Sequence, residues 1–215
     1  MKLYGFWRSS AAYRVRIALA LKGLSYDYVS VHLTKGEQYQ PAFSAVNPQN
    51  LVPVLDDEGH LLYQSLAIIQ YLDETHPEPP LIPRDPAERN RVRSLALIIG
   101  CEIHPLNNPR VLNYLTGNFA VSEEQKLAWY QHWVTTGFTA LEKRLAGESW
   151  TGRYCHGDAP GFADIALVPQ VANARRFKVD LAPFPTIRRI DEACLKLDAF
   201  RKAAPENQPD AEKKT

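Results

Sequence analysis

The sequence has little of what marks a disulfide-bonded, metal-binding or membrane-spanning chain. Its three cysteines are an odd number without metal or redox spacing, which favours a reducing compartment. The six histidines are dispersed and fit no metal template, so we expect no metal site. No apolar run approaches the roughly 18 residues of a spanning helix. Because the first residues already form an expected strand, we expect no signal peptide and a cytoplasmic location.

An excess of charge is also absent. The 25 basic and 24 acidic residues leave a net charge of +1, which gives no long-range field to attract nucleic acid or a charged membrane surface. We therefore expect a small-molecule partner, no nucleic acid and no membrane. With 215 residues, 45% of them hydrophobic, the chain can form one large or two small domains with a real core.

Two patterns divide the chain. The first part alternates short strands and helices, which is typical of a small α/β layer domain, with strands expected at residues 2–7, 26–33, 51–55 and 60–63. A stiff proline-rich linker, residues 77–86, follows. Beyond it, helical spacing predicts a bundle of five or six helices, the last around residues 187–197, and a frayed polar tail at residues 205–215.

The start of the first expected helix carries an unusual set of side chains. Ser9 or Ser10 can cap the helix with a hydroxyl oxygen. Arg8, Arg14 and Arg16 lie beside an end that the helix dipole already makes positive. Hydroxyls, free amides and arginines together indicate a place for an anion. An ordinary N-cap with solvated or ion-paired arginines fits these residues equally well.

Two further segments of the first part resemble the soluble glutathione transferases, namely Leu51-Val52-Pro53-Val54-Leu55 and the run 64–72, Gln-Ser-Leu-Ala-Ile-Ile-Gln-Tyr-Leu. The run 9–23 is similar to the signature of the zeta class of that family, and so are the runs 100–108, 167–171 and 176–181. The resemblance covers nearly the whole chain. It implies a thioredoxin-like α/β domain at residues 1–80 that binds glutathione, an all-helical substrate domain at residues 87–207, and a homodimer.

The chain departs from the class at two positions. Many zeta enzymes have Ser-Ser-Cys at the start of the signature helix, and here the third residue is Ala11. Because that cysteine is not the main group that stabilises the thiolate, we expect retained activity with altered redox behaviour. A later helix start that usually carries Ser or Thr has Gly161. We expect this glycine to lower the stability of the helix by only about a few tenths of a kcal/mol.

The resemblance implies roles for residues of the first domain. Ser9 hydrogen-bonds the glutathione sulfur, with Ser10 as the alternative if the register is shifted by one, and Ala11 lines the same pocket. Thiolate chemistry agrees, because a helix N-terminus lowers the pKa of a thiol. Val52 offers its backbone to the cysteinyl part of glutathione, and Pro53 is expected in the cis form, which keeps that edge open. A plain edge-strand proline is the alternative.

Other implied contacts come from both domains. Gln64 and Ser65, at a second helix N-terminus, suit the γ-glutamyl carboxylate, although Gln-Ser before an apolar helix is by itself usually only a cap. Gln38 is a candidate for the glycine end of glutathione. Three residues lie where the first long helix of the second half is interrupted, and the resemblance places them over glutathione and the substrate. They are His104, Asn108 and Arg110.

Arg8 and Arg176 are candidates for binding substrate carboxylates, because the guanidinium fork matches a carboxylate with two hydrogen bonds. Arg175, its neighbour, is expected to be an ordinary surface residue. The implied activity is glutathione-dependent cis–trans isomerisation of a maleyl dicarboxylate, maleylacetoacetate, in aromatic amino acid catabolism. Three alternatives stay open: a maleylpyruvate isomerase of gentisate catabolism, a transferase or dehalogenase acting on small α-halo acids, and a non-enzymatic binding module.

Overall fold

The computed structural model describes residues 1–212 and forms two compact units. The first unit joins the N-terminal 81 residues to the segment that begins at Leu195, and the second unit spans Ile82–Cys194. The sequence predicted that the helical domain would run to residue 207. The unit ends earlier because the residues after Cys194 pack against the first unit, as the contacts described below show.

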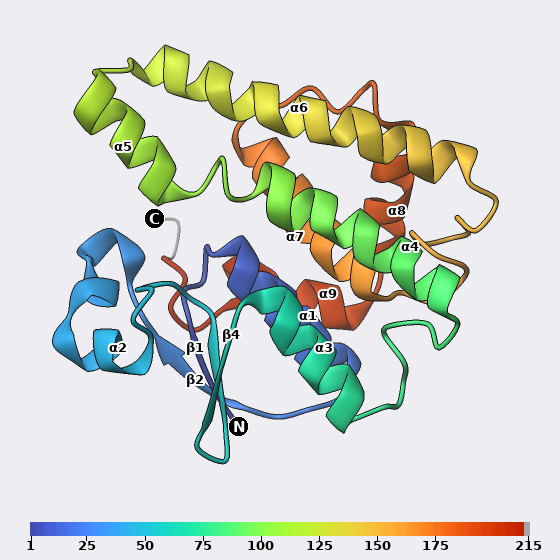
Figure 1. Cartoon of the computed structure of the whole chain (residues 1–215), viewed down its shortest axis with the longest axis horizontal. Coiled ribbons are helices and arrows are strands. Elements are labelled where there is room, and N and C mark those ends of the chain that lie inside the picture. Colours follow the sequence, from blue (N-terminus) through green and yellow to red (C-terminus); the bar gives the residue numbers. More distant parts are fainter. Residues whose placement is uncertain (213–215) are drawn as a thin grey trace. The chain divides into compact units, whose positions relative to one another are not determined.

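The first unit is a four-stranded mixed sheet with helices (Figure 1). The strand order is β2-β1-β3-β4; β1 and β2 are parallel, and the other two pairs are antiparallel. Its elements are β1 (Lys2–Gly5), α1 (Ser10–Leu21), β2 (Asp27–Ser30), the 3₁₀ turns η1 (Leu33–Lys35) and η2 (Glu37–Tyr39), α2 (Pro41–Val46), β3 (Val54–Asp57), β4 (His60–Tyr63), α3 (Ser65–Thr75), α9 (Asp198–Ala203) and the 3₁₀ turn η4 (Pro205–Asn207). Helices α1 and α3 lie side by side.

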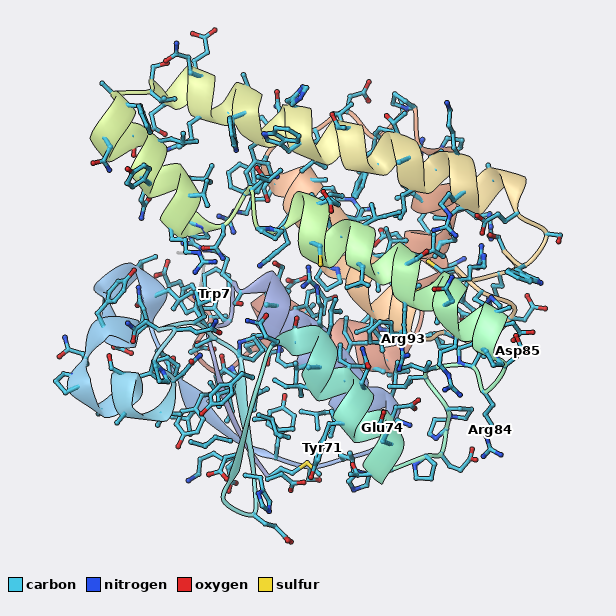
Figure 2. All side chains as sticks on the ribbon, in the orientation of Figure 1. Trp7, Tyr71, Glu74, Arg84, Asp85 and Arg93 are labelled. Atoms are coloured by element: carbon cyan, nitrogen blue, oxygen red, sulfur yellow. The ribbon has the colours of Figure 1, made fainter. Side chains whose placement is uncertain are left out.

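Strand β3 is shorter than the sequence predicted. It starts at Val54 and pairs with a strand on each side, so a residue within it needs a backbone N–H. Pro53 has no N–H and therefore lies just before the ladder rather than inside it. The Val52–Pro53 peptide bond is cis, as expected. At the other end of the strand, Tyr71 of α3 donates a 2.7 Å hydrogen bond to Asp57, beside the β3–β4 hairpin (Figure 2).

The interpretation of the signature arginines as solvated or anion-binding is wrong for Arg16. Its side chain is buried; its Nε donates to the carbonyl of Ala203 (2.9 Å) and an Nη to the carbonyl of Trp7 (3.1 Å). Tyr13 likewise donates to the carbonyl of Phe200 (3.0 Å). Within the tail expected to fray, residues 205–207 form a 3₁₀ turn and Asp210 accepts a hydrogen bond from the Trp7 amide (3.0 Å), while residues 213–215 lie outside the described residues.

The second unit is helical, as predicted. Its elements are α4 (Pro86–Leu97), the π-helical turn η3 (Ile98–Ile103), α5 (Pro109–Phe119), α6 (Glu123–Gly147), α7 (Phe162–Arg176) and α8 (Pro185–Leu195). The predicted capping box at α6 is present, because Ser122 and Gln125 exchange side-chain-to-backbone hydrogen bonds. At α7 the Gly161 amide donates to the carboxylate of Asp164, which is the half of a capping box that needs no cap hydroxyl. Within residues 1–212, no helix has the length and apolar character needed to cross a bilayer.

Arg91 of α4 ties the loop after α6 to the helical core. Its side chain is only 2% exposed. It donates to Glu148 (2.5 Å), to the hydroxyl of Thr151 (2.7 Å) and to the carbonyl of Cys155 (2.7 Å). Arg144 also donates to Glu148, at 2.7 Å. A single buried guanidinium thus donates to three polar groups along one loop, and its removal takes one donor from each of them.

Replacing this guanidinium should destabilise the second unit. We expect Arg91→Met to lower the free energy of unfolding by about 2–4 kcal/mol, because three buried or half-buried acceptors lose their donor. The midpoint of urea unfolding measures the change. Arg188→Met, which alters an exposed arginine of the same unit, should stay within about 0.5 kcal/mol. Equal midpoints for the two variants would contradict this role of Arg91.

The Glu148 carboxylate should make part of this stability depend on pH. Partial burial opposes ionisation, but the hydrogen bonds and charges of Arg144 and Arg91 outweigh it and hold the pKa of Glu148 below its ordinary 4.5. Its contribution is therefore complete above the unfolded-state pKa and is lost as the pH falls through the lower folded-state pKa. The gap in unfolding midpoint between the unsubstituted chain and Glu148→Gln should be constant near neutral pH and shrink below about pH 4.5. A gap that is independent of pH would rule this out.

Candidate active site

Strand register brings three predicted segments to one edge of the sheet. Val54 at the start of β3 pairs with Tyr4 near the end of β1 and with Tyr63 at the end of β4. The residues just beyond these positions therefore leave the sheet at the same edge. They are the β1–α1 junction (6–9), the cis peptide 52–53, and Gln64 with Ser65. The predicted glutathione residues of these segments lie together because of the register, although they are far apart in the sequence.

The helices that follow β1 and β4 are parallel, with their N-termini at this same edge. Near the start of α1, Arg14 donates to the hydroxyl of Ser65, the first residue of α3, at 3.3 Å. At the other end, Lys22 contacts Asp73 (2.6 Å) and the carbonyl of His76 (2.6 Å). One contact thus joins the N-terminal parts of α1 and α3, and the other joins their C-terminal ends. The positive dipole ends of both helices therefore lie at the β1–β3–β4 edge. Such a pair of helix starts favours an anion.

Ser9 is the N-cap of α1. Its hydroxyl oxygen accepts a hydrogen bond from the amide of Ala12 (3.2 Å), so its own proton stays free to donate to another group. Ser9 is half-exposed, whereas Ser10 is only 7% exposed. Ala11 is half-buried on the first turn. The geometry therefore supports Ser9 over Ser10 as the serine that can reach a ligand.

Arg8 stands on aromatic side chains at the same junction. Its guanidinium carbon is 5.8 Å from the ring centre of Phe6 and 5.5 Å from that of Trp7. Figure 2 places Trp7 at the turn between β1 and α1. The side chain is half-exposed, so the stacked guanidinium keeps donors toward solvent. This arrangement suits a carboxylate ligand.

The remaining predicted residues of this unit differ in their exposure and in their hydrogen bonds. Gln64 has a positive φ of 65° before α3 and is exposed, and its amide donates to Gln49 (3.1 Å). Ser65 and Val52 are buried. Gln38 lies in η2, and no hydrogen bond among residues 1–212 joins it to the other predicted residues. Its side-chain oxygen is buried without a partner there, so an acceptor is available to a ligand with amide groups.

These features fit glutathione, a peptide-like molecule with two carboxylates and a thiol. Two helix N-termini supply amides for anions, Ser9 supplies a free hydroxyl proton, and Gln38 supplies an unsatisfied acceptor. The two buried cysteines offer no alternative nucleophile, because burial raises the pKa of both Cys155 and Cys194. Within residues 1–212, no three His, Cys, Asp or Glu side chains form a group that could hold a metal ion.

In the second unit, Arg176 is the last residue of α7 and is exposed. Its guanidinium carbon lies 4.9 Å from the ring centre of Phe177. Phe177 in turn stacks on Tyr130 of α6, with ring centres 3.6 Å apart and planes at 17°. Burial raises the pKa of Tyr130 to about 12, and the Arg176 charge reduces that shift only in part. The stack holds the guanidinium of this exposed residue against an aromatic face.

The same part of α6 also supports the turn that follows η3. Trp129 donates to the carbonyl of Leu106 (2.9 Å), and Asn107 reaches the carbonyl of Tyr130 (3.5 Å). Three predicted residues lie in or beside this turn. His104 and Asn108 are half-buried, and Arg110 is exposed. Asn108 caps α5 by accepting from the Arg110 amide (3.1 Å). Its side-chain oxygen thus has a structural role.

Sequence reasoning missed three contributors. Tyr130 occupies an apolar position of a long helix, and nothing in its spacing separates it from ordinary core. Arg14 was predicted to face an anion or to be solvated or ion-paired, but it is 2% exposed and donates to Ser65. Arg175 is not an ordinary surface residue, because it forms a 2.5 Å ion pair with the fully buried Asp191. The residues next to Arg175 in the sequence do not reveal this partner, which lies 16 residues further along the chain.

Comparison with known proteins supports the family resemblance found in the sequence. Residues 3–80 match the family of glutathione S-transferase N-terminal domains. A maleylpyruvate isomerase from Ralstonia is 54% identical over 98% of this chain and all of its own. A maleylacetoacetate isomerase from Pseudomonas aeruginosa is 50% identical over 98% of both chains.

A solved structure is also similar. The maleylacetoacetate isomerase of Methylobacterium extorquens, crystallised with malonate and glutathione, has a TM-score of 0.96 and 45% identity over 99% of this chain and all of its own. The predicted thioredoxin-like unit followed by a helical unit is confirmed. With relatives this similar over nearly its whole length, the chain belongs to the zeta class of the glutathione S-transferase family.

Proposed function

We propose that this protein is a glutathione-dependent cis–trans isomerase that converts maleylacetoacetate to its fumaryl isomer. The meeting of the α1 and α3 N-termini at one sheet edge is the observation that carries the proposal. It provides separate positive ends for a thiolate and for a carboxylate of glutathione. When bound, glutathione supplies a thiolate that adds reversibly to the activated double bond, so that bond becomes single, rotates, and re-forms as trans when the thiolate leaves.

The residues of the first unit would activate the thiol. The free hydroxyl proton of Ser9 and the amides of the first turn of α1 stabilise a negative sulfur. In this proposal Gln64 and Ser65 bind the γ-glutamyl carboxylate, and the Val52 backbone binds the cysteinyl part. Gln38 binds at the glycine end. Ser9 is the catalytic serine because it is the more exposed of the two.

Arginines would hold the substrate. The guanidinium groups of Arg8 and Arg176 each lie against aromatic rings, and a guanidinium can bind a carboxylate with two hydrogen bonds. The α1 amides and Arg8 would also stabilise the negative charge that develops on the substrate carbonyl oxygen. His104, Asn108 and Arg110 would complete the helical side of the site, with Asn108 limited by its capping bond.

Maleylpyruvate is the alternative substrate. The two compounds differ by little more than a methylene between carbonyl groups, which is worth only about 1–3 kcal/mol in a pocket. The relatives carry both names at similar identities, 54% and 50%. A comparison of kcat/KM for the two compounds decides between them. The stacked arginines favour these acids over the uncharged electrophiles that a detoxifying transferase takes.

We also propose that the protein acts as a cytoplasmic homodimer in aromatic amino acid catabolism. The near-complete coverage of enzymes named for these isomerisations supports the pathway. Two buried, unpaired thiols suit a reducing compartment. Light scattering of the purified protein tests the dimer, and a monomer at assay concentration would exclude it.

Ser9→Ala should remove the group that stabilises the thiolate. We expect kcat/KM for maleylacetone to fall roughly 10- to 100-fold and the pKa of bound glutathione to rise, because a charge-assisted hydrogen bond is lost. Ultraviolet titration of the thiolate measures the pKa. Ser10→Ala is the matched control and should have the smaller effect. The reverse order would assign the role to Ser10.

Arg176→Ala should weaken substrate binding rather than thiol activation. We expect KM for maleylacetoacetate to rise roughly tenfold, while the pKa of bound glutathione is unchanged, because a bidentate carboxylate contact is lost. Arg188→Ala, an exposed arginine of the same unit, is the control and should match the unsubstituted enzyme. Unchanged KM for both maleylacetoacetate and maleylacetone would remove Arg176 from the site.

A further inference from the structure

The segment after Leu195 is an integral part of the first unit. Phe200 and Ala203 of α9 are almost fully buried. Their carbonyl groups accept hydrogen bonds from Tyr13 (3.0 Å) and Arg16 (2.9 Å) of α1. Helix α1 begins at the proposed catalytic serine. The segment therefore contacts the helix on which the proposed chemistry depends.

Beyond α9, the carboxylate of Asp210 binds the junction that carries Arg8 and Ser9. One of its oxygens accepts three hydrogen bonds, from the backbone amide of Trp7 (3.0 Å), the hydroxyl of Tyr28 (3.1 Å) and the hydroxyl of Ser30 (3.0 Å). Tyr28 and Ser30 belong to β2, which pairs with β1. Asp210 thus ties the junction to the neighbouring strand as well as to the C-terminal segment.

The junction is fixed from its other side by Arg16. This buried guanidinium donates to the carbonyls of Trp7 (3.1 Å) and Phe6 (3.5 Å). The amide of Ser9 donates to the carbonyl of Phe6 (2.9 Å). A negative group therefore holds the amide of Trp7 while a positive group holds its carbonyl. The next two residues along the chain are Arg8 and Ser9, so their backbone direction follows from this clamp.

We propose that Asp210 is a positioning residue for the isomerase: it fixes the Trp7 amide and thereby sets the places of the Ser9 hydroxyl and the Arg8 guanidinium. Asp210 itself does not touch the reacting atoms. The inference rests on the proposed function, since it gives Asp210 its effect through Ser9 and Arg8. A misplacement of about 1 Å in a reacting group can cost roughly 100-fold in rate.

The test uses Asp210→Ala and Asp210→Asn in the full chain. Asp210→Ala should raise the pKa of bound glutathione and lower kcat for maleylacetone roughly 10- to 100-fold per glutathione-binding site. Asp210→Asn keeps an acceptor without the charge and should lie between Asp210→Ala and the unsubstituted enzyme, because charge-assisted bonds are stronger than neutral ones. Glu206→Ala, an exposed acid of the same segment, is the control and should match the unsubstituted enzyme in both measurements.

A purely structural anchor predicts a different result. It would lower the thermal midpoint of Asp210→Ala while the folded enzyme kept its kcat and thiol pKa, and that result overturns the proposal. If Asp210→Ala does not fold, unchanged kcat and thiol pKa in Asp210→Asn overturn it equally. If the unsubstituted chain does not turn over maleylacetone, the proposed function fails, while the thiol pKa still reports whether Asp210 positions Ser9.

Discussion

The pairing of Val54 with Tyr4 on one side and Tyr63 on the other is the constraint on which the first unit depends. Because the pairing fixes which residues lie opposite each other at the strand ends, this register decides where each connection leaves the sheet. A shift by one residue would exchange the faces on which the buried Val54 and Leu55 of β3 pack. It would also move the two helix starts apart. The grouping of the proposed ligand-binding segments at one edge is therefore a consequence of strand pairing.

Polar side chains then specify how the helices stand on that sheet. Arg14 joins the two helix starts, and Lys22 joins the two helix ends. Both side chains are nearly fully buried, where an unpaired charge is costly, so each must find its partner for the unit to fold. The helices consequently have one direction relative to each other, and their dipoles add at the site instead of cancelling.

Much of this fold could be predicted from the sequence, because helix starts and special peptide bonds depend on residues that are close together in the chain. Capping residues gave the starts of α1, α3 and α6, and Pro53 indicated a special peptide bond before β3. What escaped prediction depends on distant partners. The polar composition of the last residues predicted fraying, since composition does not reveal that a carboxylate meets three donors from the first 30 residues. Burial of Arg16 was equally hidden, because its acceptors are backbone carbonyls that any sequence has.

The first unit is discontinuous in sequence, and this affects how the chain can fold during synthesis. Residues 1–81 leave the ribosome first, but α1 still lacks the carbonyls that Tyr13 and Arg16 bind, which belong to residues made after the whole second unit. Translation at roughly 5–20 residues per second delays that closure by several seconds. The helical unit, whose residues are contiguous, can complete its core before the glutathione-binding unit does, which reverses the usual order in which the N-terminal domain folds first.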